Sequence, residues 1–163
     1  MSGFQARMLA LAGLACCSGR GDIKPRPAQS TAARTDSVAA ADQAARRKLD
    51  EGRWLLLGGD CGAAKAAFEI ASNQPTTRSS ALLGLAEAEF QLGGFAAAES
   101  LATKAVAEGG GVRARVVLGN IRLKLGDDRG AVRSYESALA LDGGNQEARR
   151  NLAVARRRGA RRR

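Results

Sequence analysis

Small and apolar residues recur along this chain at a nearly constant interval. Gly59, Gly93 and Gly126 lie 34 and 33 residues apart. Around each glycine the same relative positions are again small or apolar: Gly52, Ala64, Phe68 and Ala71; Ala86, Ala98, Ala102 and Ala105; Gly119, Ala131, Tyr135 and Ala138. A unit of this length that repeats several times is typical of stacked helical arrays. The pattern therefore predicts an all-α fold, a short α-solenoid of about three helix-turn-helix repeats followed by a C-terminal capping helix.

Each repeat is predicted to be a pair of helices joined by a tight turn. Residues 80–92 carry leucines and alanines at helical spacing, and Gly93 follows them directly. A glycine just past a helix end adopts the left-handed conformation cheaply and stops the helix. The residue after the glycine is Asp60, Gly94 or Asp127, and an aspartate there can cap the free amides of the second helix.

The recurring small residues are expected to lie where the two helices of a repeat cross, because small side chains let the backbones approach closely. Gly52, Ala86 and Gly119 would then face Ala64, Ala98 and Ala131. Phe68 and Tyr135 would fill the wider gap one turn along, whereas Ala102 would need help from Phe90 or Phe95. Trp54 is expected to pack within the first helix pair, with a groove-exposed position as the alternative. Cys61 is expected to be a small buried filler.

Residues 1–17 have the pattern of an export signal. Arg7 is their only charge, and an apolar run from Met8 to Ala15 ends at Cys16 and Cys17. The run is shorter than the roughly 20 apolar residues that cross a bilayer, and it fits the apolar region of a signal peptide. Small residues before a cysteine resemble the lipobox of bacterial lipoproteins, which would make Cys16 or Cys17 the lipidated residue. Plain secretion and an unprocessed apolar N-terminus are the alternatives.

The rest of the chain divides into a linker, a repeat domain and a tail. Residues 18–35 hold two of the three prolines and almost no large apolar residue, so we expect a disordered linker. The repeat domain is predicted at 36–158, with repeats at about 45–78, 79–111 and 112–145 and a capping helix at 146–158; residues 159–163 form a basic tail. An exported chain of this kind would lie in the bacterial cell envelope, on the periplasmic side; the cytoplasm is the alternative.

The sequence also predicts how the first and the last helix of the repeat domain begin and pack. The first helix is expected to begin near Asp36 and to cover the open side of the first repeat. Asn145 is the expected N-cap of the last helix, and Leu152 and Val154 would pack on the third repeat. Caps with a polar outer face keep solenoids soluble.

Positive charge is concentrated near the C-terminus. The formal net charge is +10, and residues 146–163 contribute +7 of it through eight arginines and one acid. Six of these arginines form a candidate polyanion-binding tail: Arg156, Arg157, Arg158, Arg161, Arg162 and Arg163. Such a tail suits an anionic lipid surface. The tail has no aromatic residues on which bases could stack, and the export signal also argues against nucleic acid. A solvated chain end is the plainer interpretation.

Composition argues against catalysis. The chain has no histidine and only three cysteines, which leaves no expected metal site and no histidine-based nucleophile. Asp127 and Asp128 are explained by helix capping, and no other acids have a spacing tied to chemistry. The sequence therefore predicts no catalytic residues, no metal, no cofactor and no enzyme activity.

Two stretches in the third repeat carry a family resemblance. Residues 118–127 and 131–142, together with 91–98, are similar to the consensus of the tetratricopeptide repeat family. The resemblance covers about residues 45–155 and suggests, with the export signal, a bacterial tetratricopeptide repeat lipoprotein. The family's usual tyrosine late in the first helix is Leu55, Glu89 and Arg122 here, and the charged residues predict looser packing at that position.

The resemblance implies a protein–protein interaction scaffold that binds a peptide or helix in a groove lined by the first helix of each repeat. The implied groove residues are Arg53, Leu83, Glu87, Phe90, Arg113, Asn120, Lys124 and Arg150, together with Arg46, Leu49, Leu56, Ser80, Gln91, Val116, Leu123, Glu147, Asn151 and Val154. A family subset clamps a C-terminal carboxylate, but Val116 stands where that clamp needs a lysine, so we do not expect it here. For any single groove residue a solvated helix face is the alternative. The partner's identity and the oligomeric state stay open.

Overall fold

The fold is a row of α-helices, as the repeat pattern predicted. The structure, a computed structural model, describes residues 31–161. Seven helices and no strand lie in this part of the chain: α1 (Thr31–Leu57), α2 (Cys61–Ser72), α3 (Pro75–Gln91), α4 (Phe95–Ala107), α5 (Gly111–Leu125), α6 (Asp128–Leu141) and α7 (Gln146–Arg161). Cys16, Cys17, Arg162 and Arg163 lie outside the described residues, as does most of the predicted linker.

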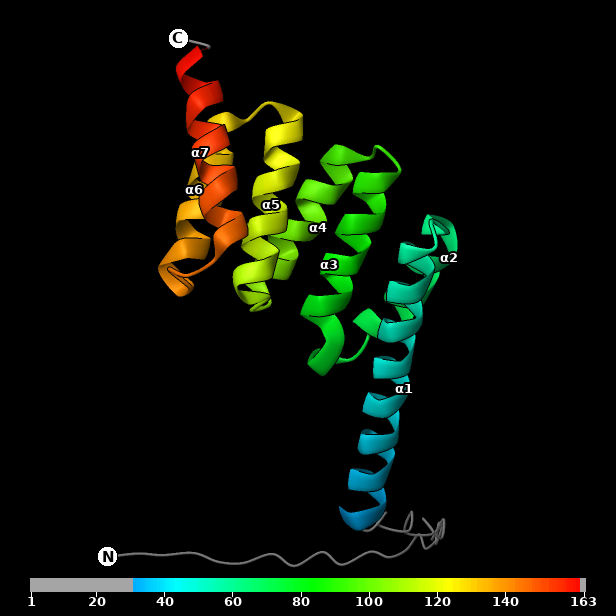
Figure 1. Cartoon of the computed structure of the whole chain (residues 1–163). Coiled ribbons are helices and arrows are strands. Elements are labelled where there is room, and N and C mark those ends of the chain that lie inside the picture. The colour runs from blue at the N-terminus through cyan, green and yellow to red at the C-terminus, as the bar shows by residue number, and fades with distance from the viewer. Residues whose placement is uncertain (1–30, 162–163) are drawn as a thin grey trace, which may run out of the picture.

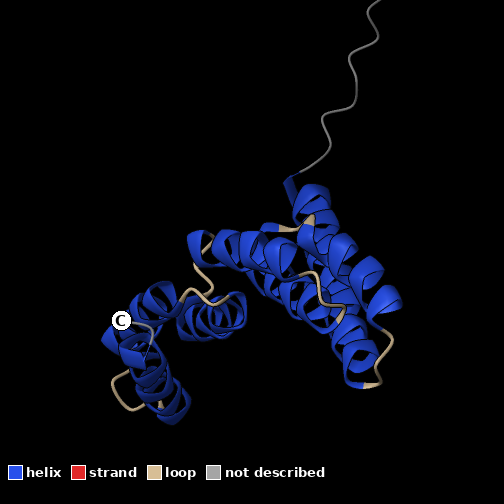
Figure 2. Ribbon diagram, turned by 90° about the horizontal axis from the view of Figure 1, so that it is seen from above, coloured by secondary structure: helices blue, strands red, loops and turns tan. Residues whose placement is uncertain are grey.

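The helices form two layers. Each helix packs against the next one along the chain, and α1, α3, α5 and α7 also contact one another in sequence. These odd-numbered helices build the layer nearest the viewer in Figure 1, with α2, α4 and α6 behind them. Figure 2 looks down on the array and shows the row of helix pairs bending round rather than running straight. The arrangement is a short α-solenoid of three helix pairs closed by α7.

The turn inside each repeat has the predicted geometry. Gly59, Gly93 and Gly126 have φ values of 84°, 81° and 83°. At each turn the amide of the following residue donates to a carbonyl five positions earlier, at 2.8–2.9 Å. Asp60 and Asp127 then cap the second helix, because their side chains accept from the amides of Ala63 at 2.9 Å and Gly130 at 2.8 Å. The predicted glycine ends of the first helices and the predicted aspartate caps of the second helices are confirmed.

In the first and third repeats, the two helices approach closely because an aromatic ring lies directly against a glycine. Phe68 and Tyr135 are fully buried. A Cβ on Gly52 would lie 2.7 Å from the Phe68 ring, and one on Gly119 would overlap the Tyr135 ring. Gly84 on α3 also contacts Phe68: a Cβ added to Gly84 would lie 2.5 Å from the Phe68 ring. These glycines thus make room for a ring as well as for the facing alanines, which the sequence pattern alone did not distinguish.

The middle repeat has no aromatic residue at the position that Phe68 and Tyr135 occupy in the other two repeats. Ala102 replaces the aromatic residue and is fully buried with Ala86 and Ala98. Phe90 packs against this cluster, and its ring meets that of Phe95 edge-on with centroids 5.3 Å apart. Edge-to-face contacts of this kind stabilise beyond their buried area. The compensation expected from Phe90 is therefore present.

Helix α1 departs from expectation in where it begins and in the exposure of Trp54. It begins at Thr31, before the predicted start near Asp36, and its N-terminal part projects away from the array in Figure 1. Residues 35–40 are exposed, so the helix does not cover the open side of the first repeat; α2 is too short to reach them. Trp54 is 76% exposed because Ala45 and Leu49 occupy the buried side of α1. The expectation that Trp54 packs in the first helix pair is wrong, whereas the burial of Cys61 is confirmed.

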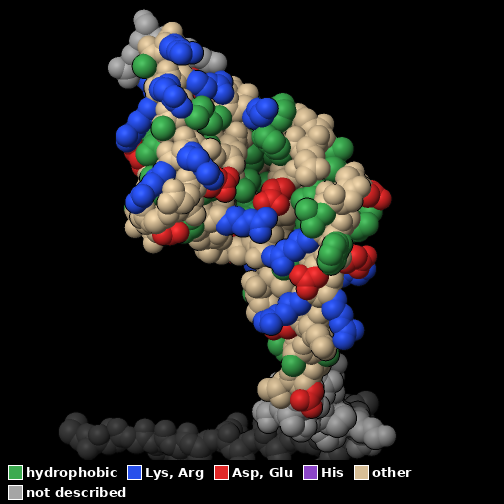
Figure 3. Space-filling view, viewed as in Figure 1, with side chains coloured by type: hydrophobic (Ala, Val, Ile, Leu, Met, Phe, Trp, Pro, Cys, Tyr) green, Lys and Arg blue, Asp and Glu red, His purple; other side chains and the backbone are tan. Residues whose placement is uncertain are grey.

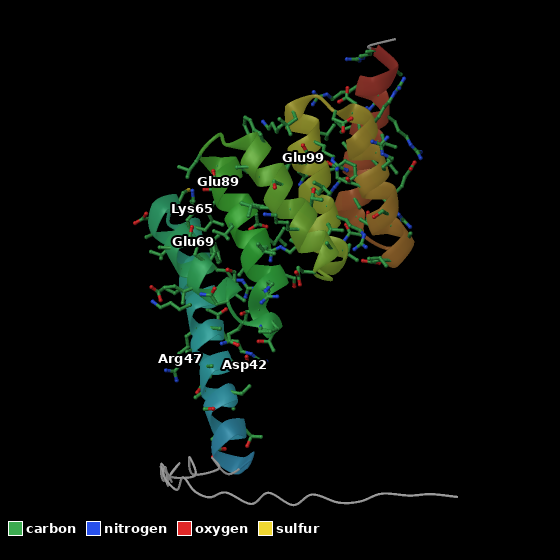
Figure 4. The ribbon with its side chains drawn as sticks, turned by 180° about the vertical axis from the view of Figure 1, so that it is seen from behind. Asp42, Arg47, Lys65, Glu69, Glu89 and Glu99 are labelled. Atoms are coloured by element: carbon green, nitrogen blue, oxygen red, sulfur yellow. The ribbon has the colours of Figure 1, made fainter. Side chains whose placement is uncertain are left out.

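The charged residues Glu89 and Arg122, at which the sequence predicts looser packing, form ion pairs with neighbouring helices. Glu89 on α3 accepts from Lys65 on α2, and this hydrogen bond raises the pKa of the Lys65 ammonium. Glu99 on α4 accepts from Arg122 on α5 at 2.8 Å. Figure 4 views the array from behind and shows Lys65 beside Glu89. Ion pairs therefore link α2 to α3 and α4 to α5 at two of the positions where the sequence predicts looser packing.

Helix α7 caps the array. Asn145 accepts from the amide of Ala148 at 2.9 Å, which confirms it as the N-cap. Ala148, Leu152 and Ala155 are buried against the third repeat. Val154, which we expected to pack there too, is 38% exposed because it lies off this stripe. The helix extends to Arg161, beyond the predicted end at 158.

Replacing Gly119 by alanine tests the close approach. The added methyl would overlap the Tyr135 ring, so we expect Gly119→Ala to lower the free energy of unfolding by about 1–3 kcal/mol. Gly62→Ala is the matched control: its Cβ would meet only the Asp60 carboxylate, at 3.7 Å. The control should be neutral or stabilising by less than about 1 kcal/mol, because alanine favours helix over glycine. Urea unfolding measures both, and equal effects would contradict the packing role of Gly119.

Candidate functional site

The odd-numbered helices present one continuous surface, which we call the groove face. It is formed by α1, α3, α5 and α7, the layer nearest the viewer in Figures 1 and 3. Figure 3 shows lysine and arginine side chains gathered over α7 and acidic side chains nearer the middle of this face. Because the first helix of every repeat contributes to it, the groove face is the surface that the repeat resemblance singled out.

A hollow of about 660 Å³ lies on this face between α3, α5 and the start of α7. We call it the central hollow. Its lining residues are Glu87, Phe90, Gln91, Val112, Arg113, Val116, Val117, Asn120, Ile121, Asp142, Asn145 and Glu147. The size lies within the range of small-ligand pockets. The hollow combines an apolar floor of valines, Ile121 and Phe90 with polar groups at its rim.

A smaller hollow of about 250 Å³ adjoins it toward α1, and we call it the side hollow. Its lining includes Arg53, Ser79, Ser80, Leu83 and Gly84. Glu87 and Arg113 line both hollows and are joined by two hydrogen bonds, since one Arg113 nitrogen lies 2.9 Å and 3.2 Å from the two Glu87 carboxylate oxygens. This ion pair bridges α3 and α5 and separates the two hollows.

Asn120 connects the groove face to the core. Its side-chain oxygen accepts from the Tyr135 hydroxyl at 2.7 Å and from the Asn151 amide at 2.8 Å. Its own amide nitrogen lies 3.3 Å from a Glu147 carboxylate oxygen. Burial raises the pKa of the Tyr135 phenol, and the negative charge of Glu147 raises it further. The network fixes Asn120 in one orientation and ties α5, α6 and α7 together.

The structure brings most of the predicted groove residues together. Glu87, Phe90, Arg113 and Asn120 line the central hollow, and Arg53 and Leu83 line the side hollow. Leu83 is only 5% exposed, because it packs against Ala105 and Ala114. Lys124 and Arg150 are exposed but line neither hollow.

Five lining residues of the central hollow were not predicted. Val112, Val117 and Ile121 lie on α5, beside predicted positions, and Asp142 and Asn145 come from the loop between α6 and α7. Val112, Val116 and Ile121 recur at roughly helical spacing in the sequence, and this spacing could have indicated a wide apolar floor. The loop residues gave no such signal, since their placement depends on how α7 docks.

Two arginines of the predicted polyanion tail form ion pairs with acidic residues of α6. Arg156 bonds Glu136 at 2.8 Å, and Arg158 lies 3.3 Å from the buried carboxylate of Asp128. A hollow of about 750 Å³ between α6 and α7 includes Arg156 in its lining. Among the described residues this leaves Arg157 and Arg161 of the proposed tail without such an ion pair.

The described residues add two negative findings. No group of three or more histidine, cysteine, aspartate or glutamate residues between 31 and 161 is placed to hold a metal ion. None of the helices in that range is both long and apolar enough to span a membrane.

Several solved structures are similar to this one. The first tetratricopeptide repeat domain of Spaghetti (RPAP3), bound to the HSP90 peptide SRMEEVD, is 26% identical over 73% of this chain and 95% of its own, with a TM-score of 0.68. The first such domain of human RPAP3 is 25% identical over 73% and 94%, with a TM-score of 0.69. The Arabidopsis OM64 domain is 22% identical over 72% and 98%, with a TM-score of 0.66.

These similar structures are all tetratricopeptide repeat domains, a class of helical repeats whose helix pairs stack into a solenoid. The described part of the chain has the tetratricopeptide repeat fold, which the resemblance of residues 118–127 and 131–142 to the family consensus predicted. No protein-family model matches the sequence, and no curated protein matches it either.

The buried phenol of Tyr135 predicts a loss of stability at high pH. Its pKa is raised above the 10.0 of a free tyrosine, so the folded phenol keeps its proton where the unfolded one ionises. The contribution is constant below pH 10 and declines above it, by up to about 1.4 kcal/mol per pH unit. Urea unfolding in buffers on either side of that pH measures the slope. Tyr135→Phe should lower stability below pH 10, because it removes the hydrogen bond to Asn120, and should flatten this slope above pH 10. An unchanged slope would contradict the assignment.

Proposed function

We propose that this protein is a non-catalytic interaction scaffold that binds a segment of a partner protein across its groove face. The observation that carries the proposal is the central hollow, where an apolar floor is surrounded by a few fixed polar groups. Apolar pockets with a small number of oriented polar groups are the usual form of binding sites. The Asn120 network and the Glu87–Arg113 pair hold the polar groups in place before a ligand arrives.

The similar structures support the same reading of the groove face. The Spaghetti domain is bound to a peptide, which shows that a related array of this size takes a short segment of another protein. This chain is not expected to clamp a C-terminal carboxylate as a subset of the family does, because Val116 is buried on the groove side of α5 where that clamp needs a lysine. A different segment chemistry is therefore expected here.

The sequence before the described residues supports a proposal for location. An apolar run that ends at Cys16 and Cys17 fits export and lipidation in a bacterial envelope. A lipidated cysteine anchors a chain to a membrane, because each buried methylene contributes about 0.8 kcal/mol, so the repeat domain would be presented at a membrane surface. The scaffold would then bring a partner to the envelope, on the periplasmic side.

Blocking the central hollow tests the binding proposal. Peptides are selected from a random display library on the full chain, and their affinity is measured by fluorescence anisotropy. Val112→Arg places a long charged side chain in the hollow and should weaken binding about tenfold or more. Ile70→Arg adds the same charge at an exposed site on α2, in the other layer, and should leave affinity unchanged. Failure to select any peptide, or equal effects of both variants, would contradict groove binding.

Metabolic labelling with a fatty acid tests the anchor. In a bacterial host the wild-type chain should incorporate label and sediment with membranes. The double variant Cys16→Ser, Cys17→Ser should lose both properties, whereas Cys61→Ser should keep them because Cys61 is buried in the repeat domain. A wild-type chain that stays unlabelled removes the lipid anchor from the proposal while leaving groove binding untouched.

A further inference from the structure

The charges around the central hollow indicate which kind of segment binds there. This inference rests on the proposed function, since it concerns the same groove face. The floor of the hollow is apolar, with Val112, Val117 and Phe90 half-buried and Val116 and Ile121 buried beneath them. A hollow of about 660 Å³ accommodates a large aliphatic or aromatic side chain together with its neighbours. The floor is therefore suited to a large apolar side chain of the bound segment.

Three carboxylates and one guanidinium line the same hollow. Arg113 bonds both carboxylate oxygens of Glu87, so these two charges offset each other. Asp142 accepts from the backbone amide of Gly144 at 2.9 Å, and Glu147 accepts from the Asn120 amide at 3.3 Å. Both of these donors are uncharged. Asp142 and Glu147 thus leave about two negative charges at the rim.

Two sources of positive potential, the dipole of α7 and the arginines of α7, oppose the negative charge of Asp142 and Glu147. Each contributes less than the two carboxylates do. The start of α7 adds about half a positive charge through its helix dipole. Arg149 and Arg150 follow Glu147 by two and three residues on α7, but neither lines the hollow and both are exposed, so solvent and salt screen their charges. The rim consequently stays negative although the whole chain has a formal net charge of +10.

We propose that the central hollow binds a partner segment in which a lysine or arginine lies next to a large apolar side chain. The apolar side chain fills the floor, and the cation lies against Asp142 and Glu147. A segment rich in carboxylates meets like charge at this rim, and like-charge contacts oppose binding.

The test uses peptides selected on the full chain from a random library. Selected peptides whose affinity falls with Val112→Arg should be enriched in lysine or arginine beside an aliphatic or aromatic residue. Each is then resynthesised with its basic residues replaced by glutamate, which should weaken binding to the wild type about tenfold. Glu147→Lys should weaken the basic peptides and strengthen the glutamate versions.

Two further variants keep the result interpretable. Glu69→Lys makes the same change in net charge at an exposed site on α2 and should leave both peptide sets unaffected. The double variant Asp142→Asn, Glu147→Gln removes the rim charge while keeping amide acceptors, and should weaken the basic peptides if Glu147→Lys fails to fold. Groove-dependent peptides that are acidic, or that respond equally to Glu69→Lys, would overturn the inference and leave groove binding intact. If no selected peptide depends on Val112, groove binding and the inference both fail.

Discussion

The contact of an aromatic ring with a glycine on the neighbouring helix governs this structure. Phe68 lies against Gly52 and Gly84, and Tyr135 lies against Gly119, at distances that leave no space for a Cβ. Close-packed interiors transmit strain because they contain few voids. The spacing between helices in the first and third repeats is thus set by a ring that only glycine admits, and the course of the solenoid follows from that spacing.

The same contact extends to the groove face through one hydroxyl. Tyr135 is fully buried, yet its oxygen reaches Asn120 at the lining of the central hollow. Asn120 in turn bonds Asn151 of α7, so the capping helix, the third repeat and the hollow share one network. Buried polar networks that are fully satisfied specify a unique arrangement. Core packing and the shape of the binding surface therefore depend on the same residues.

Sequence reasoning succeeded where a local rule determines the outcome. Glycine beyond a helix end, aspartate or asparagine before a helix and small residues at fixed spacing each have one physical explanation, and Gly126, Asp127 and Asn145 behave accordingly. It failed where exposure depends on neighbouring elements. Trp54 is exposed because α1 has neighbours on one side only, and the acidic rim was missed at Asp142 because that residue lies in a loop whose position depends on α7.

The most direct test of the account is nuclear magnetic resonance of the full chain with its single tyrosine selectively labelled. The account predicts nuclear Overhauser effects from the Tyr135 ring to the α-protons of Gly119, and from the Tyr135 hydroxyl region to the side-chain amides of Asn120 and Asn151. It also predicts that a groove-binding peptide shifts the Asn120 amide resonance. A solvent-exposed Tyr135 ring with no contact to Gly119 would contradict the packing on which both the fold and the groove depend.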